Sequence, residues 1–274
     1  MRRATAAAKI NLALVVGEPR ADGLHEVATV LQRIDVCDRL ELTEARGLAV
    51  DGFAADTLVR AALERLAEAA GTAPAWRVRI RKEIPVAAGI GGGSADAAAA
   101  LRLANEILPS PLSRDQLHEL AVTLGADVPF FLAPGPQLAE AAGERLTPLD
   151  LPQDYWVVLA FPRGARKTST REIYERFDRL GGPAGFAERK ETLLRALEQA
   201  TRPRHFAAFP PNDLAQAAGD RTLADELRAA GAFRSDLSGA GPAVYGLFHR
   251  LESAREAAGS LRRVARTWVT APVW

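Results

Sequence analysis

Apolar and polar residues alternate in several segments of the chain, a period of two that is typical of a β-strand with one buried face. In segment 76–81, three apolar residues alternate with three arginines. Segment 7–16 also alternates, and the apolar segments 27–34 and 39–44 indicate two further strands. In the second half of the chain, strands are expected at 155–161, 233–237 and 263–270.

Other segments repeat apolar residues at helical spacing. Segment 57–70 has such a stripe, formed by Leu58, Ala61, Ala62, Leu66 and Ala69. Ser113 and Gln116 have the spacing of a capping box, which predicts a helix from there to about Leu124. Further helices are expected from about Arg171 and at 187–199, 222–230 and 251–259.

Between the strand at 76–81 and an alanine-rich helix lies a loop with four glycines, within segment 85–105. We expect Ser94 to cap this helix, whose interior runs over 97–103. A helix N-terminus carries unpaired N–H groups and a partial positive charge, so a glycine loop that leads into one favours an anion, most often phosphate. A flexible surface loop is the alternative.

The common phosphate loops do not fit this segment. A Walker A loop needs Lys and then Ser or Thr after its last glycine, whereas Gly93 is followed by Ser94 and Ala95. A dinucleotide-binding loop needs a third glycine where Ser94 stands. A protein kinase has HRD and DFG sequences, which this chain lacks.

Composition and charge narrow the class of protein. The chain has 274 residues, 48% hydrophobic content and a formal net charge of +1, which gives no reason to expect nucleic acid or a membrane surface as a partner. Lys9 and Asn11 interrupt the apolar N-terminal segment, so it does not match a signal peptide. The single Cys37 cannot form an internal disulfide, and we expect a cytoplasmic protein. The histidines are scattered and show no metal-ligand spacing.

Lysine is scarce in this chain, which makes each lysine informative. Of 35 basic residues, 35 − 4 = 31 are arginines, and the lysines are Lys9, Lys82, Lys167 and Lys190. A compact ammonium suits a tight phosphate site better than a planar guanidinium does. In the strand expected at 7–16, Lys9 and Asn11 share a face, with Cα atoms roughly 6–7 Å apart. A solvated strand face is the alternative.

Three segments in order resemble the motifs of the GHMP kinases, the family of galactokinase, homoserine kinase and mevalonate kinase. Segment 85–94 is similar to the second motif, which runs from a proline through Gly-x-Gly and small residues to a serine before a helix. Segments 8–12 and 237–244 resemble the first and third motifs. The resemblance implies a two-domain α+β fold with the active site in the interdomain cleft, and domains of residues 1–150 and 151–274.

The resemblance also implies ATP and Mg²⁺ as cofactors. It assigns the ATP-binding loop to Pro85, Val86, Ala87, Ala88, Gly89, Ile90, Gly91, Gly92, Gly93, Ser94 and Ala95. The magnesium ligands stay unassigned, because Ser94 is retained while Ala95 stands where the family usually has a second serine.

Two further motifs are similar to one branch of the family, which phosphorylates a cytidine diphosphate conjugate of methylerythritol. They are Asp-Gly-Leu-His-Glu at 22–26 and Gly-Ala-Asp-Val-Pro at 125–129. The resemblance implies that Asp127 is the catalytic base, with Lys9 as its electrostatic partner, a pairing that suits proton removal from an alcohol. From the residues alone, Asp127 is equally well explained as a helix N-cap or an Asx turn.

The branch resemblance further implies that Asn11, His25 and Tyr174 bind the substrate, His25 and Tyr174 through its cytosine. Leu24 departs from the pattern, since the branch usually has an aromatic residue there to stack on the base. The basic loop with Arg163, Arg166 and Lys167 suits a phosphorylated ligand, although a solvated loop is just as common.

Two alternatives to this substrate remain open at the level of the sequence. One is another small-molecule GHMP kinase, of the homoserine or mevalonate type, which Leu24 favours. The other is a catalytically dead nucleotide-binding homologue, against which the retention of both Lys9 and Asp127 argues. The expected partner is a small-molecule substrate, and the expected state is a monomer or weak homodimer.

Overall fold

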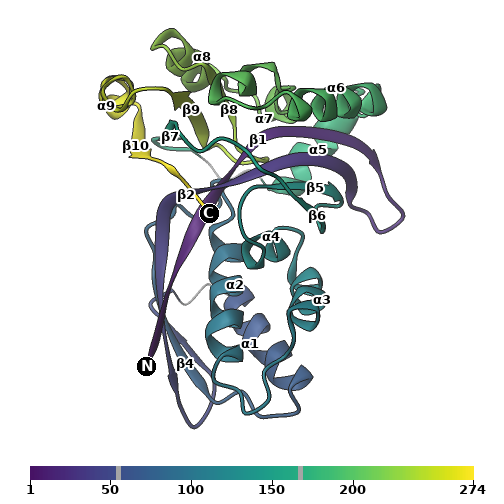
Figure 1. The fold of residues 1–274 in the computed structure, drawn as a ribbon, viewed down its shortest axis with the longest axis vertical. Helices are drawn as coiled ribbons and strands as arrows, with labels where there is room; N and C mark the ends of the chain where they lie inside the picture. Colours follow the sequence, from purple (N-terminus) through teal and green to yellow (C-terminus); the bar gives the residue numbers. More distant parts are fainter. Residues whose placement is uncertain (54–56, 166–168) are drawn as a thin grey trace. The chain divides into compact units, whose positions relative to one another are not determined.

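A computed structural model describes residues 1–53, 57–165 and 169–274, so Arg166 and Lys167 of the expected basic loop lie outside the described residues (Figure 1). The chain forms two compact units. Unit 1 consists of Met1–Ala8, Val36–Val86 and Gly91–Pro134, and unit 2 of Lys9–Asp35, Ala87–Ile90 and Gly135–Trp274. The strands β1 (Arg2–Pro19) and β2 (His25–Glu44) pair with each other, and each contributes residues to both units.

In unit 1, a sheet is covered by helices. Residues 39–44 of β2 pair antiparallel with β4 (Trp76–Arg81), and β3 (Ala49–Asp51) pairs parallel with β4. The apolar residues of β4 are buried and its arginines are exposed, which confirms the alternation read from the sequence. The segments expected to form separate strands at 27–34 and 39–44 belong instead to the single strand β2, because Asp35 and Asp38 are accommodated within it without a turn.

Four helices complete unit 1 as far as it is described: α1 (Thr57–Ala69), α2 (Gly92–Asn105), α3 (Arg114–Leu124) and α4 (Val128–Leu132). The helices α1 and α2 pack side by side (Figure 1). Residues 97–100 of α2 are four alanines with 0% exposure, and their small side chains let the neighbouring backbones approach closely. The capping box at the start of α3 is confirmed, with reciprocal hydrogen bonds between Ser113 and Gln116.

The start of α2 differs from the prediction. The helix begins at Gly92, and Gly91, with φ 73°, occupies the N-cap position. Ser94 therefore lies inside the first turn, and its expected capping role is wrong. Glycine adopts this left-handed conformation without the steric cost that a side chain brings, which explains why the loop turns into a helix earlier than the serine suggests.

Unit 2 contains the remaining strands, in two groups. The first part of β2 pairs with β5 (Gln137–Ala141), which pairs with β6 (Arg145–Pro148), and β11 (Pro272–Val273) also pairs with β2. A second, antiparallel sheet has the order β10-β7-β9-β8. Its strands are β7 (Trp156–Pro162), β8 (Arg234–Leu237), β9 (Val244–Phe248) and β10 (Ala265–Thr270).

The helices of unit 2 lie near their expected positions. The α-helices are α5 (Thr170–Arg179), α6 (Phe186–Glu198), α7 (Ala215–Ala218), α8 (Thr222–Ala229) and α9 (Leu251–Ser260), and the short 3-10 helices are η1 (Pro203–Ala208) and η2 (Leu261–Arg263). Residues of α8, α9 and the second sheet form one buried apolar cluster that includes Leu227, Val244 and Phe248. Among the described residues, no helix has the length and apolar character that a membrane span requires.

Candidate active site

Lys9 and Asn11 are buried in unit 2. They are only 4% exposed, so the solvated strand face considered for them is wrong. The Lys9 ammonium donates to Asn11 Oδ1 at 2.8 Å, and the Asn11 amide donates to the Thr29 hydroxyl at 2.8 Å. Thr29 in turn donates to the carbonyl of Ala13 at 2.7 Å. This chain of hydrogen bonds fixes the ammonium, because each side chain holds the next in one orientation.

A glycine turn of the third motif lies against these two side chains. Ser238 donates from Oγ to Asn11 Oδ1 at 3.4 Å and to the carbonyl of Gly89 at 3.1 Å. At Gly239, an added Cβ would lie 3.4 Å from Asn11 Oδ1 and 3.6 Å from Lys9 Nζ. Unit 2 therefore brings together parts of all three motifs that the sequence singles out: the lysine strand, residues 87–90 of the glycine loop, and the turn after β8.

The two glycine segments touch through their backbones. The N–H of Ala243 donates to the carbonyl of Ala88 at 3.1 Å, and the N–H of Lys9 donates to the carbonyl of Ile90 at 3.0 Å. An added Cβ at Gly241 would lie 2.1 Å from the carbonyl oxygen of Ala88. Only glycine permits such an approach, so these glycines serve the packing of the loop as well as any approach to phosphate.

Gly89→Ala is expected to destabilise unit 2 by about 1–3 kcal/mol, because Gly89 has φ 80° and the new Cβ would lie 2.3 Å from the carbonyl oxygen of Ser238. Urea unfolding measures the loss. Gly93→Ala is the matched control, since no described atom lies within 4 Å of its Cβ and its place in α2 favours alanine by up to about 1 kcal/mol. Equal stability of the two variants would contradict this account of Gly89.

The rest of the glycine loop belongs to unit 1. Residues 91–95 form the start of α2, whose first N–H groups have no partner within the helix and therefore suit an anion. An added Cβ at Gly92 would lie 2.8 Å from Ile84 and 3.5 Å from the Lys82 ammonium. The Lys82 side chain therefore lies beside the first turn of α2.

Lys82 belongs to a buried ionic cluster that the sequence analysis missed. Its ammonium contacts Asp38 and lies 2.7 Å from Asp96 Oδ2, and both carboxylates are fully buried. Asp38 also accepts the backbone N–H groups of Glu83 and Ile84, at 2.6 and 2.9 Å. Burial lowers the pKa of Lys82, but the charge of Asp96 and the hydrogen bonds to both carboxylates outweigh it, so the pKa is raised. The scarcity of lysine, applied to Lys9, could also have singled out Lys82.

Asp127 stands at the N-cap position of the short helix α4 in unit 1, but its side chain makes no capping hydrogen bond. The capping explanation of this aspartate is therefore wrong, although its backbone does lead into a helix. Helix α4 packs against α2 and α3. Lys9 belongs to unit 2 and Asp127 to unit 1, and their pairing stays a prediction.

The residues expected to contact cytosine meet in unit 2. The rings of His25 and Tyr174 have centroids 4.7 Å apart and are tilted by 45°. His25 Nε2 lies 2.9 Å from Asp178 Oδ1, and the histidine side chain is only 9% exposed. Leu24 is 52% exposed. Asp178 was not identified from the sequence, although its spacing of four residues from Tyr174 places both on one face of α5.

Asn212 holds the glycine turn of the third motif in place. Its amide donates to the carbonyls of Leu237 and Gly239, at 3.2 and 2.7 Å, and its Oδ1 accepts the N–H of Leu214. The last contact is an Asx turn just before α7 (Ala215–Ala218), whose N-cap residue is Leu214 and which has no side-chain capping hydrogen bond. The contacts of Asn212 with the turn could be identified only from the structure, because more than twenty residues separate the two segments in the sequence.

The described residues contain no group of three or more His, Cys, Asp or Glu side chains that could hold a metal ion by themselves. Magnesium in phosphoryl-transfer sites usually binds to one or two carboxylates, phosphate oxygens and water rather than to an all-protein cage. No residue is assigned as a magnesium ligand.

Family models match two parts of the chain, which contain the second and third motifs and the Asp127 segment. The GHMP kinases N terminal domain matches residues 57–135, and the GHMP kinases C terminal domain matches residues 219–267. The fold is similar to that of Methanococcus jannaschii mevalonate kinase, with a TM-score of 0.78 at 12% identity over 100% of this chain and 98% of that one. Fold and motifs together define a GHMP kinase, which confirms the expected α+β fold and the resemblance.

More similar proteins identify the branch. A solved 4-(cytidine 5'-diphospho)-2C-methyl-D-erythritol kinase matches with a TM-score of 0.82 and 34% identity, over 100% of both chains. The 4-diphosphocytidyl-2-C-methyl-D-erythritol kinase of Geobacter sulfurreducens is 37% identical over 98% of this chain and 96% of its own length. That of Pelotomaculum thermopropionicum is 39% identical, over 95% and 93%. The chain belongs to the 4-diphosphocytidyl-2-C-methyl-D-erythritol kinase family.

Proposed function

We propose that this kinase transfers the γ-phosphoryl group of ATP to the 2-hydroxyl of 4-diphosphocytidyl-2-C-methyl-D-erythritol, a step in non-mevalonate isoprenoid precursor biosynthesis. The names of its relatives support this substrate. The observation that carries the proposal is the convergence of buried Lys9 and Asn11 with Gly89 and Gly239 in unit 2. A buried, oriented ammonium beside two glycine segments suits the recognition of phosphate.

Different residues are assigned different roles in the reaction. The hydroxyl of the substrate has a pKa far above neutrality, so we assign Asp127 as the base that accepts its proton as the oxygen attacks phosphorus. We assign Lys9 to stabilise the negative charge that develops on the attacking and transferred oxygens. ATP supplies the phosphoryl group, and Mg²⁺, which we also propose, neutralises charge on its phosphates. Residues 85–95 are proposed to bind those phosphates, through the backbone of the loop and the N-terminus of α2.

His25 and Tyr174 are proposed to bind the cytosine, and Asn11 to contact the substrate near the reacting hydroxyl. When Nε2–H of neutral His25 donates to Asp178, at 2.9 Å, Nδ1 is left as an acceptor. Such an acceptor matches the amino group of cytosine and not the carbonyl that uracil has in its place. This arrangement supports a cytidine compound as the substrate.

Tyr174→Ala is expected to raise KM for the cytidine substrate about tenfold, with kcat and KM for ATP nearly unchanged, because the loss of a stacked aromatic ring costs about 1 kcal/mol or slightly more. Leu24→Tyr is expected to lower the same KM, since it adds the aromatic residue that the branch usually has. Steady-state kinetics with each substrate varied in turn measures both effects. Leu180→Ala, an exposed residue just after α5, is the control. An equal change in KM for both substrates would refute a role of Tyr174 at the base.

ADP release tests the proposed function directly. The purified protein, with ATP and Mg²⁺, is assayed with 4-diphosphocytidyl-2-C-methyl-D-erythritol and, in parallel, with homoserine, mevalonate and phosphomevalonate. Turnover with the cytidine compound alone supports the proposal. Turnover with another alcohol would retain a kinase and reject the cytosine site, which is the alternative that the exposed Leu24 favours. No turnover with any of them would indicate a dead homologue.

The expected cellular location, oligomeric state and domain boundary are also proposals. We propose a cytoplasmic location, which the single Cys37 supports because a chain with one cysteine forms no internal disulfide, as is usual in a reducing compartment. We further propose that the enzyme acts as a monomer or weak homodimer, and that its domains divide near residue 150, between the segments that the two family models match.

A further inference from the structure

The outer face of the sheet in unit 1 carries a row of exposed arginines. The apolar residues of β4 are buried, and Arg77, Arg79 and Arg81 alternate with them on the exposed face. The register of the sheet places Arg39 of β2 directly opposite Arg81. Two like charges directly opposite each other on neighbouring strands are destabilising. A bound anion between them would remove that repulsion.

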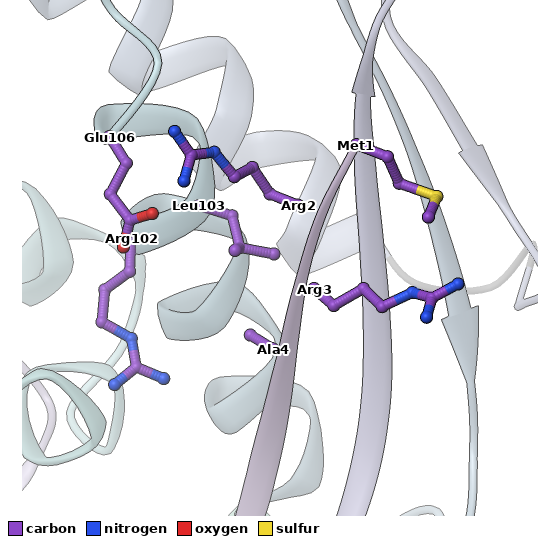
Figure 2. Close-up of a pocket in the computed structure, with 7 residues that line it drawn as sticks. All are labelled: Met1, Arg2, Arg3, Ala4, Arg102, Leu103 and Glu106. Atoms are coloured by element: carbon purple, nitrogen blue, oxygen red, sulfur yellow. The ribbon is translucent and has the colours of Figure 1, made fainter.

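Of these arginines, Arg39, Arg79 and Arg81 line a groove of about 870 Å³ that lies entirely within unit 1. Its charged lining residues are Arg3, Arg39, Glu41, Arg79, Arg81 and Arg102. A smaller pocket beside it shares Arg3 and Arg102. Figure 2 shows that Arg2 extends from β1 toward the end of α2, whereas Arg3 extends to the other side of the strand.

The groove concentrates positive charge far beyond the average of the chain. Five arginines and one glutamate line it, a formal charge of +4. The whole chain carries only +1, so the rest of the molecule is net negative. The charges are therefore segregated, and a general excess of arginine over lysine does not explain the groove. Such a concentration of one sign of charge in a concave surface attracts ligands of the opposite sign.

Nearby carboxylates neutralise this charge only in part. Arg3 pairs with Glu41 at 2.8 Å, and Arg81 lies 3.8 Å from Glu83. Both pairs are largely exposed and hold their partners weakly. Among the described residues, Arg39 and Arg79 have no carboxylate within ion-pairing distance. Their guanidinium groups are available to an external anion.

We propose that this arginine groove binds an anion that carries several phosphate groups in a row, such as a linear polyphosphate. Guanidinium groups bind phosphate oxygens in pairs of parallel hydrogen bonds, and arginines two apart on a strand are roughly 6–7 Å apart, close enough to serve neighbouring parts of one such chain. The alternative polyanion is a nucleic acid. Single-stranded nucleic-acid sites place aromatic residues between the basic ones, and none of the described lining residues is aromatic.

The arginine groove shares no charged residue with the proposed nucleotide site. None of its charged lining residues belongs to loop 85–95 or to the residues assigned to catalysis and substrate binding. Binding in the groove should therefore persist when the nucleotide site is filled. This also makes the inference independent of the proposed function.

Calorimetric titration with inorganic tripolyphosphate, at low salt and with a saturating non-hydrolysable ATP analogue, tests the proposal. The wild-type protein is expected to bind tripolyphosphate, with an affinity that falls as salt rises. The double variant Arg79→Gln, Arg81→Gln is expected to bind at least about tenfold more weakly, as the loss of charge-assisted hydrogen bonds predicts. Arg77→Gln is the matched control. It lies on the same face of β4, pairs with Asp51 at 3.3 Å and does not line the groove, so its affinity should stay within about twofold.

Three results would overturn the proposal. They are no binding by the wild type, an equal loss in the Arg77→Gln control, and tighter binding of a single-stranded oligonucleotide than of a polyphosphate of equal charge. Thermal unfolding checks that the variants fold, and Arg39→Gln provides a second, single-site test on the neighbouring strand. Turnover of the kinase reaction should be unchanged in every variant.

Discussion

Asp127→Asn is expected to lower kcat by about 10²- to 10⁴-fold, the usual contribution of a positioned general base. Asparagine has the same shape but cannot accept the proton of the substrate hydroxyl. Since the side chain of Asp127 makes no capping hydrogen bond to α4, the substitution should not unfold that helix. The affinity for ATP, measured by calorimetry, should stay within about twofold, because removal of a group needed only in the transition state leaves ground-state binding intact.

Asp115→Asn is the control for this variant. Asp115 also lies at the start of a helix, α3, where it is exposed, and its replacement should leave kcat unchanged. If Asp127→Asn weakened ATP binding in proportion to turnover, the aspartate would have a structural role and the assignment of the base would be wrong. That outcome would leave the membership of the family untouched.

Lys82→Met is expected to lower the free energy of unfolding by about 3–5 kcal/mol, because it leaves two buried carboxylates without their common cation. Asp38 and Asp96 are fully buried, and Lys82 is only 14% exposed. The pKa of Lys82 is raised above 10.5, so its contribution is fully present below pH 10.5 and is lost only as the pH rises through the higher folded value. Urea unfolding at neutral pH therefore measures the full effect.

Lys190→Met provides the comparison for that experiment. Lys190 lies 2.6 Å from Glu140 in a more exposed pair, and its loss should cost no more than about 1 kcal/mol. Adding Asp96→Asn to Lys82→Met should restore part of the stability, since it removes one uncompensated charge. Equal losses in the two lysine variants would show that the buried cluster contributes no more than a surface pair.

Local patterns in the sequence predict most of the elements and some of the site. The alternation in β4, the capping box of α3 and the glycine loop before α2 depend on neighbouring residues, and all three are present in the structure. The early start of α2 was not predictable from Ser94, because Gly91 supplies the left-handed turn that ends the loop. The unbroken strand β2 was missed for a related reason, since its polar residues are stabilised by contacts that a local pattern does not contain.

Contacts between residues that lie far apart in the sequence could be identified only from the folded structure. The approach of Gly89 to Ser238 joins residues 149 positions apart, and the local sequence around either residue does not indicate it. Asp178 was accessible in principle from its helical spacing to Tyr174, but nothing in the local sequence indicates that His25 lies beside it. The alternating pattern around Lys9 fits a solvated strand face as well as a buried one. Only the burial of its side chain in the structure excludes the solvated face.

The backbone contacts of residues 87–90 have a consequence for the thermodynamics of nucleotide binding. The carbonyls of Ala88, Gly89 and Ile90 accept hydrogen bonds from Ala243, Ser238 and Lys9, respectively. This part of the loop is therefore ordered by its own protein neighbours before any ligand arrives. A disordered loop would lose conformational entropy on binding, at roughly 1–2 kcal/mol for each residue that becomes fixed. In this protein the loop loses that conformational entropy when unit 2 folds, not when the nucleotide binds. More of the interaction energy with the phosphates therefore contributes to the binding affinity.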